Sequence, residues 1–95
     1  MTSRPSAATR TSVNVTVRYW ASARAVAGCD SECFGGLDVD GLSVGDVLEA
    51  AAAAHAGLSA VLGVSTILLD GRAVTASEPL VEGVTLEVLP PFAGG

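Results

Sequence analysis

Apolar and polar residues alternate with a period of two over residues 13–20. One set of alternating positions is apolar or aromatic throughout and comprises Val13, Val15, Val17 and Tyr19. The other set is polar apart from its last member and comprises Asn14, Thr16, Arg18 and Trp20. Such alternation is the signature of a strand with one buried face. The pattern predicts a strand that begins near Ser12 and buries its valines, and it leaves Trp20 on a face that is otherwise polar.

Two segments have the composition and end signals of helices. Residues 21–27 (ASARAVA) have high helix propensity, and Gly28 favours a stop directly after them. A longer helix is expected to begin at Ser43, because Ser43 and Asp46 have the S-x-x-D form of an N-terminal cap with an acid in the first turn. Its apolar stripe comprises Val44, Val47, Leu48 and Ala51. We expect this main helix to extend over residues 43–56.

A second strand is predicted between these helices. Residues 30–39 return to strand-like spacing, and the positions expected to face the core are Cys33, Leu37 and Val39. Gly35 and Gly36 lie inside this segment. Because glycine within a strand often marks a bulge or a break, we expect the strand to be irregular at this point.

The second half of the chain predicts a hairpin and a final strand. Residues 65–69 and 72–74 flank Asp70-Gly71, a dipeptide that readily supplies the two positive φ values of a tight turn. Residues 84–89 alternate again, and their apolar face comprises Val84, Leu86 and Val88.

The order of these elements predicts the fold class. Strand, short helix, strand, main helix, strand pair and strand form an α+β pattern without internal repeats. The main helix has to cover one face of a single mixed sheet of about five strands, with parallel terminal strands paired inside the sheet. The expected fold is a ubiquitin-like β-grasp. In that arrangement Trp20 and Leu89 lie close together on the face turned away from the helix.

The charge balance narrows the range of partners. The chain of 95 residues has ten acidic and five basic residues, all five of them arginine, and a net charge of −5. An acidic surface argues against phosphate backbones and anionic lipids, so we expect neither nucleic acid nor a membrane as partner. No apolar run approaches the roughly 18–20 residues needed to span a bilayer, and residues 1–11 lack the apolar stretch of a secretory signal. A cytoplasmic location is expected.

Few side chains in the sequence have a spacing suited to catalysis. We find no paired carboxylates beside a base, no Ser/His/Asp or Cys/His set with supporting context, and no glycine-rich phosphate loop. Cys29 and Cys33 are spaced C-x-x-x-C, which fits neither a redox pair nor half of a zinc knuckle. His55 lies at the end of the main helix, where the helix dipole favours a cation. We therefore expect two reduced thiols, no bound metal and no enzymatic activity of the chain by itself.

The C-terminus is the feature most suited to chemistry. After Leu89 the chain reads PPFAGG. Two prolines end a strand and favour an extended exit from the sheet. Gly94 and Gly95 lack side chains, so the terminal carboxylate can be threaded along a channel too narrow for a Cβ. Because a carboxylate is a poor electrophile, its use requires another protein to activate it as a mixed anhydride with adenylate.

These observations divide the chain into three parts. Residues 1–11 are expected to form a disordered tail, because they offer little to bury. Residues 12–89 form the predicted β-grasp domain. Residues 90–95 form the predicted extended, flexible and reactive tail.

The motifs at both ends resemble those of the MoaD/ThiS family of ubiquitin-like sulfur carriers. They are VNVTVRYWA at residues 13–21, LDG in the hairpin at residues 69–71, and LPPFAGG at residues 89–95. The ending most resembles that of the small subunit of molybdopterin synthase. The resemblance implies that an E1-like adenylyltransferase uses ATP and Mg to adenylate Gly95. A sulfurtransferase or cysteine desulfurase then supplies the sulfur that converts Gly95 to a thiocarboxylate.

The resemblance also implies partners and a contact surface. The molybdopterin synthase large subunit, or another sulfur-accepting enzyme, draws the sulfur from the tail, and the carrier itself binds no cofactor. An apolar surface near the root of the tail is implied, and the strand alternation separately turns Trp20 and Leu89 outward. The expected partner-binding residues are Trp20, Leu89, Pro90, Pro91, Phe92 and Ala93.

Two other functions fit the same residues. The same carrier chemistry could serve cysteine, thiamin or thio-metabolite biosynthesis, because the partner chooses the acceptor. Gly95 could instead join the chain to lysines of other proteins, as in a ubiquitin-like modifier, or the domain could be an interaction module with an inert tail. The chain has no lysine of its own, which disfavours the formation of chains of linked copies.

Overall fold

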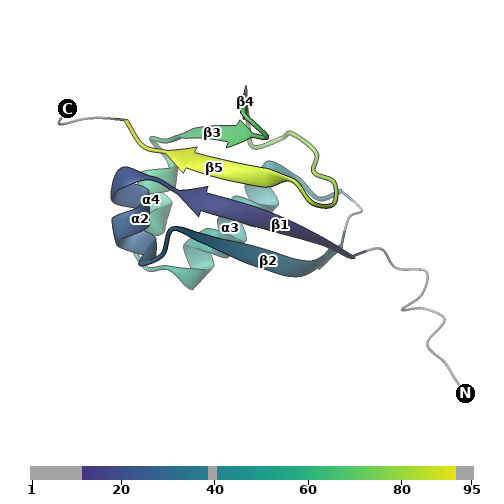
Figure 1. The fold of residues 1–95 in the computed structure, drawn as a ribbon, viewed down its shortest axis with the longest axis horizontal. Helices are drawn as coiled ribbons and strands as arrows, with labels where there is room; N and C mark the ends of the chain where they lie inside the picture. Colours follow the sequence, from purple (N-terminus) through teal and green to yellow (C-terminus); the bar gives the residue numbers. More distant parts are fainter. Residues whose placement is uncertain (1–11, 39–40, 92–95) are drawn as a thin grey trace, which may run out of the picture.

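Five strands form one mixed sheet in the computed structural model, which describes residues 12–38 and 41–91 (Figure 1). The strands are β1 (Ser12–Tyr19), β2 (Ser31–Asp38), β3 (Thr66–Leu69), β4 (Arg72–Val74) and β5 (Thr85–Leu89). Their order across the sheet is β2-β1-β5-β3-β4. β1 and β5 are parallel neighbours, and the other pairs are antiparallel. The last strand, β5, is therefore an interior strand that is hydrogen-bonded to a neighbour on each side.

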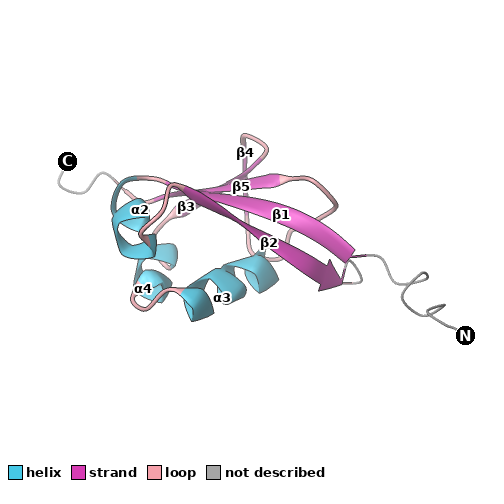
Figure 2. Ribbon diagram, turned by 60° about the horizontal axis from the view of Figure 1, so that its bottom comes forward, coloured by secondary structure: helices cyan, strands magenta, loops and turns pink. Residues whose placement is uncertain are grey.

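Three helices cover one face of this sheet, as Figure 2 shows. They are α2 (Ala21–Ala27), α3 (Val44–Ala54) and α4 (Leu58–Leu62). The predicted β-grasp arrangement is confirmed, with the first and last strands parallel and the main helix, α3, on one face of the sheet.

The core lies between the sheet and the helices. The alternation predicted for β1 is confirmed, because its valines and Tyr19 are buried whereas Trp20 is exposed. The largest fully buried side chains are Tyr19, Leu58, Leu86, Val13, Val15, Val17, Val44, Val47 and Val88. Burial of a branched aliphatic side chain of this size stabilises a fold by roughly 1.5–3 kcal/mol. Every fully buried residue in the described ranges is hydrophobic, so polar side chains gather at the edges of the core.

The predicted irregularity in β2 is a bulge. Val13 of β1 pairs with Leu37, and Val15 pairs with Phe34, so two steps along β1 correspond to three steps along β2. Gly36 lies in the extra segment with a φ of 71°, a conformation that glycine adopts without steric cost. An extra residue reverses which side chains of a strand face the core.

The sequence prediction for the inward face of β2 was wrong on one side of this bulge. Leu37 is half-buried, as expected, but Cys33 is exposed. Glu32 and Phe34 take the half-buried positions instead. An uninterrupted alternation through Gly35 and Gly36 places Cys33 inward, but the bulge shifts the alternation by one residue. Val39, the third residue expected to face inward, lies outside the described residues.

The predicted cap of α3 is present as a complete capping box. The Ser43 side chain accepts a hydrogen bond from the Asp46 N–H at 3.3 Å, and the Asp46 carboxylate accepts one from the Ser43 N–H at 2.9 Å. The helix ends at Ala54, two residues before the predicted boundary, because His55 has an extended backbone. Gly57, with a φ of 88°, precedes the separate helix α4.

The Asp-Gly hairpin is confirmed and is tied to the final strand. Asp70 and Gly71 have φ values of 48° and 88° and connect β3 to β4. The Asp70 carboxylate accepts a hydrogen bond from the Thr85 N–H at 3.0 Å. This contact anchors the hairpin to the start of β5, the strand from which the tail departs.

Candidate functional site

A hollow lies beside the end of β5, where the chain leaves the sheet. Its lining residues are Trp20, Ala21, Thr66, Leu89, Pro90 and Pro91, and its volume is about 440 Å³. Trp20 directly follows β1, and Thr66 pairs with Leu89 at the start of β3, so the hollow spans the ends of three adjacent strands. The predicted proximity of Trp20 and Leu89 is confirmed. A concave, mainly apolar surface of this kind suits an apolar side chain of a partner protein.

Two contacts hold the Trp20 ring at the rim of this hollow. The indole N–H donates a hydrogen bond to the Glu87 carboxylate at 3.2 Å. The Arg18 guanidinium lies 5.1 Å from the ring centroid, in the range of a cation–π contact. Trp20 nevertheless remains 41% exposed to solvent. An aromatic ring that is exposed and already fixed in position loses little conformational entropy when it binds a partner.

The last described residues set where the tail begins. Leu89 is paired in the sheet, Pro90 is buried, and Pro91 is exposed. Because proline has no backbone N–H, the sheet ladder cannot continue through this dipeptide. The root of the tail is therefore fixed on the sheet, beside the hollow. The remaining predicted site residues, which lie outside the described part of the structure, are Phe92, Ala93, Gly94 and Gly95.

Sequence reasoning missed two lining residues of the hollow. Side chains alternate along β3, so Thr66 faces outward whereas Ile67 is buried. The sequence TILL does not reveal this alternation, because three consecutive residues are apolar. Ala21 has a φ of 50°, which turns the chain sharply from β1 into α2. Neither feature leaves a local signal in the sequence, because both depend on how the ends of the strands are arranged.

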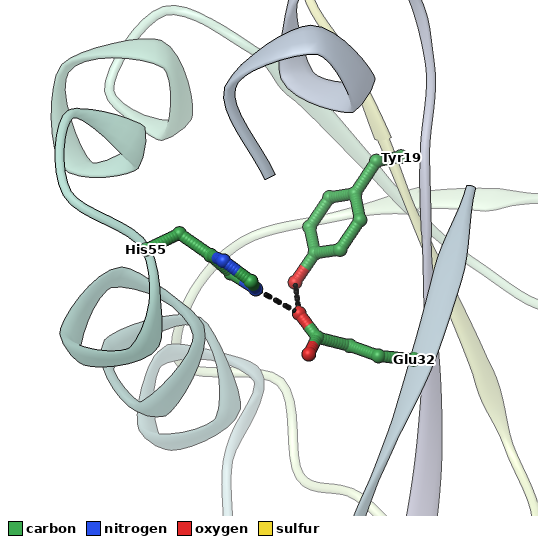
Figure 3. A network of polar contacts seen from close by, with 3 residues as sticks. All are labelled: Tyr19, Glu32 and His55. Carbon is green, nitrogen blue, oxygen red and sulfur yellow. Dashed lines mark hydrogen bonds and ion pairs between the residues drawn. The ribbon is translucent and has the colours of Figure 1, made fainter. Parts of the chain in front are cut away.

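A second polar cluster lies on the helix side of the sheet, as Figure 3 shows. The Tyr19 hydroxyl donates a hydrogen bond to Glu32 Oε2 at 2.7 Å. His55 Nε2 lies 2.5 Å from the same oxygen, so Glu32 links β1 to the end of α3. The Tyr19 ring also packs edge-on against the His55 ring, with centroids 6.0 Å apart. Burial, followed by the hydrogen bond and the charge of Glu32, raises the pKa of the Tyr19 hydroxyl well above its ordinary value.

The Cys29 thiol lies beside this cluster. Its sulfur, a Glu32 carboxylate oxygen and a His55 ring nitrogen all lie within 4.8 Å of one another. Desolvation and the charges of Glu32 and Asp30 raise the pKa of the Cys29 thiol, so it is neutral at physiological pH. Cys29 and Cys33 are both free, as expected. Sequence reasoning considered Cys29 and His55 separately, and Glu32 was not singled out because the bulge hides its inward orientation.

The architecture defines a class of protein. A single mixed sheet with central parallel β1 and β5, and with α3 across one face, is a ubiquitin-like β-grasp from which a short tail departs at an interior strand. The chain belongs to the ThiS family, whose model matches residues 17–95. The matched region includes the ending PPFAGG but not residues 12–16 of β1. The likeness to the family therefore extends over the tail.

The chain is similar to solved structures of a molybdopterin converting factor subunit and of a small archaeal modifier protein. The protein SAMP1 from Haloferax volcanii is 32% identical, with a TM-score of 0.74 over 86% of this chain and 99% of that one. A Pyrococcus furiosus protein assigned as molybdopterin converting factor subunit 1 is 29% identical, with a TM-score of 0.73 over 83% of this chain and 98% of that one. The chain thus has the fold of ThiS/MoaD-like sulfur carriers and of the small archaeal modifiers.

A more distant structure shows the same fold in an assembly. The complex of subunits 1 and 2 of molybdopterin-converting factor from Helicobacter pylori matches with 24% identity and a TM-score of 0.59, over 87% of this chain and 100% of that one. At this identity the likeness supports the fold alone. A sequence search of curated proteins gives no match. None of the helices in the described ranges is long and apolar enough to cross a membrane.

Proposed function

We propose that this chain is a sulfur carrier whose Gly95 carboxylate is adenylated and converted to a thiocarboxylate. We further propose that it serves as the small subunit of molybdopterin synthase in molybdenum cofactor biosynthesis. The observation that carries the proposal is the ThiS family match, which runs through Gly94 and Gly95. The departure of that tail from an interior strand, beside an apolar hollow, supports it.

The chemistry belongs to the tail and to its partners. The Gly95 carboxylate attacks the α-phosphorus of ATP on an E1-like adenylyltransferase, and pyrophosphate leaves. A sulfide sulfur then attacks the acyl carbon of the adenylate, AMP leaves, and the thiocarboxylate remains. ATP and Mg are bound by the activating enzyme and not by this chain. Because Gly94 and Gly95 have no side chains, this end of the tail can enter a narrow catalytic channel of the partner.

The fold positions this tail for transfer. β5 is hydrogen-bonded on both sides, so the root of the tail stays fixed while the last residues enter a partner. The six residues after Leu89 can extend about 20 Å from the sheet. In this proposal the hollow receives a side chain of the synthase large subunit, and Phe92 and Ala93 extend the contact along the tail.

The first test is the intact mass of the full chain before and after incubation with an E1-like adenylyltransferase, ATP and a sulfide source. We expect a mass gain that corresponds to one oxygen replaced by one sulfur. A chain lacking Gly94 and Gly95 is the control, because both residues follow the last strand and their removal leaves the sheet intact. We expect this control to fold, by circular dichroism, and to gain no mass.

Two outcomes would contradict the sulfur-carrier proposal. The full chain could remain unchanged with an enzyme that modifies a known carrier under the same conditions. The truncated chain could also gain the same mass, which would place the modification elsewhere. The molybdopterin assignment has its own test, because the thiocarboxylate form should bind the synthase large subunit. Failure to bind any such subunit would favour an acceptor in cysteine, thiamin or thio-metabolite biosynthesis.

The likeness to SAMP1 favours a second candidate function. Two crystal structures of this Haloferax volcanii protein, small archaeal modifier protein 1, match the chain with 31% and 32% identity. In this alternative an amine attacks the Gly95 adenylate, AMP leaves, and an isopeptide bond forms on another protein. Because Arg72 is the last trypsin site of the chain, tryptic peptides that carry residues 73–95 on the lysines of other proteins would support the modifier over the carrier.

A further inference from the structure

Three side chains with different ligating atoms converge at the edge of the core. Cys29 lies in the turn after α2, Glu32 lies in β2, and His55 follows α3. One ligating atom of each lies within 4.8 Å of the other two, and all three residues are half-buried. The cluster is thus assembled by the fold from three separate segments.

We propose that Cys29, Glu32 and His55 bind a divalent cation of the zinc class, with Tyr19 as a positioning residue. Thiolate, imidazole and carboxylate are the three donor types that proteins use for Zn²⁺. Bond lengths of about 2.0–2.3 Å place neighbouring ligand atoms of a tetrahedral site about 3.5 Å apart. Side-chain adjustments of about 1 Å therefore bring these three atoms to coordination distance. Three protein ligands leave the fourth position to water or to an exogenous ligand.

The hydrogen bonds of the cluster favour coordination through Glu32. Tyr19 and His55 both contact Oε2 of Glu32, and Figure 3 shows the other carboxylate oxygen directed away from these two side chains. The Tyr19 hydroxyl can keep its hydrogen bond and orient the carboxylate while a cation takes the place of the contact between His55 Nε2 and Glu32. Residues that hold a metal-ligating carboxylate in this way typically contribute to affinity without touching the metal.

The charges around the cluster also favour a cation. Glu32 and Asp30 both place a carboxylate close to the Cys29 sulfur. In the described ranges, Arg24 pairs with Asp30 and Arg72 pairs with Glu78, whereas no arginine pairs with Glu32. A bound divalent cation supplies the missing positive charge, and the thiol proton passes to solvent as the sulfur coordinates.

The test is a titration of the full, reduced chain, without an affinity tag, with Co²⁺ as a spectroscopic substitute for Zn²⁺. We expect one equivalent of Co²⁺ to give visible bands of tetrahedral intensity and a thiolate-to-cobalt charge-transfer band. Addition of Zn²⁺ should abolish both. We also expect X-ray absorption of the Zn²⁺-loaded chain to show one sulfur ligand together with nitrogen and oxygen ligands.

The two cysteines provide a matched pair of variants. Cys29→Ser should remove the charge-transfer band and weaken Co²⁺ binding at least about 100-fold. Cys33→Ser should change neither, because Cys33 is exposed on the opposite side of β2. Tyr19→Phe should keep the charge-transfer band but weaken binding about 10- to 100-fold, as expected for a residue that acts through Glu32.

Several results would overturn the metal site. These are substoichiometric binding by the wild-type chain, a charge-transfer band that survives in Cys29→Ser, and a band that is lost in Cys33→Ser. Circular dichroism of each metal-free variant separates loss of a ligand from loss of the fold. The absorption spectrum of the wild-type chain tests the site even if a variant does not fold. This proposal is independent of the sulfur-carrier function, because neither Gly94 nor Gly95 takes part in it.

Discussion

Tyr19 has two structural roles, one for its ring and one for its hydroxyl, and the apolar–polar alternation of β1 predicts only the first. Its ring is an inward-facing member of β1, and it is only 2% exposed. Its hydroxyl reaches the edge of the core and donates to Glu32 at 2.7 Å. A buried aromatic ring with a polar end needs such a partner, because an unpaired buried hydroxyl is costly. The residue therefore connects the apolar core to the Glu32–His55 pair.

The hydroxyl of Tyr19 can be tested apart from its ring. Tyr19→Phe keeps the packing but removes a hydrogen bond to a carboxylate, so we expect the free energy of unfolding to fall by about 1–2 kcal/mol. The measurement is urea denaturation in the presence of a chelator. Trp20→Phe is the matched control, because it removes an exposed hydrogen bond to Glu87 and should cost less than about 0.5 kcal/mol. Equal losses in the two variants would contradict the role assigned to Tyr19.

At the scale of elements, local signals predicted most of the secondary structure. The capping box of Ser43 and Asp46 and the Asp70-Gly71 turn are set by neighbours within four residues, and both are present in the structure. The end of α3 was placed too late because the alanine run continues the helical signal through residue 54 and beyond. The extended backbone of His55, whose side chain contacts β2, decides where the helix stops.

The bulge in β2 is the element on which the second cluster depends. Gly36 has a φ of 71°, and a Cβ added there would have no atom within 4 Å. An alanine at this position would therefore destabilise the fold only through its unfavourable backbone conformation. We expect Gly36→Ala to lower the free energy of unfolding by about 1–2 kcal/mol. Thermal denaturation monitored by circular dichroism measures this change.

Gly63 offers the matched control for this prediction. Its φ of −63° suits any residue, and the nearest atom to an added Cβ is 3.6 Å away. Gly63→Ala should be neutral or stabilise the fold by about 0.4–1 kcal/mol, because alanine restricts the unfolded chain. A Gly36→Ala variant as stable as Gly63→Ala would show that the bulge does not require the left-handed conformation.

At the scale of the whole molecule, the sheet order brings the C-terminal ends of the first and last strands together. β1 and β5 are parallel neighbours, so Trp20 and Leu89 meet at one end of the sheet although they lie far apart in the sequence. Tyr19 and Trp20 are consecutive and point to opposite faces. The proposed zinc-class site and the hollow are therefore on opposite sides of the same strand end.

The docking role proposed for the hollow predicts a loss of affinity without a loss of stability. Trp20→Ala removes an exposed aromatic ring, so we expect binding to the molybdopterin synthase large subunit to weaken at least about tenfold while the melting temperature changes little. Isothermal titration calorimetry measures the dissociation constant. Val81→Ser is the control, since Val81 is 61% exposed and does not line the hollow. An unchanged dissociation constant for Trp20→Ala would exclude the hollow from the interface.

The sequence alone determined the features that depend on near neighbours. The alternation of β1, the cap of α3, the Asp-Gly turn and the glycine-ended tail are each set by residues a few positions apart, because backbone conformation and local hydrogen bonding act over that range. The arrangement of parallel terminal strands also followed, since one main helix and five strands leave few compact solutions. The proximity of Trp20 and Leu89 was predictable from that arrangement together with the strand alternation.

Only the tertiary structure decided which side chains meet across the sheet. The bulge at Gly35 and Gly36 turns Glu32 inward and Cys33 outward, and a shift of one residue in this register would exchange the two. The position of His55 depends on where α3 ends against β2. The cluster with Cys29 thus arises from packing between segments that share no local pattern, because contacts across the core, and not contacts along the chain, fix their register.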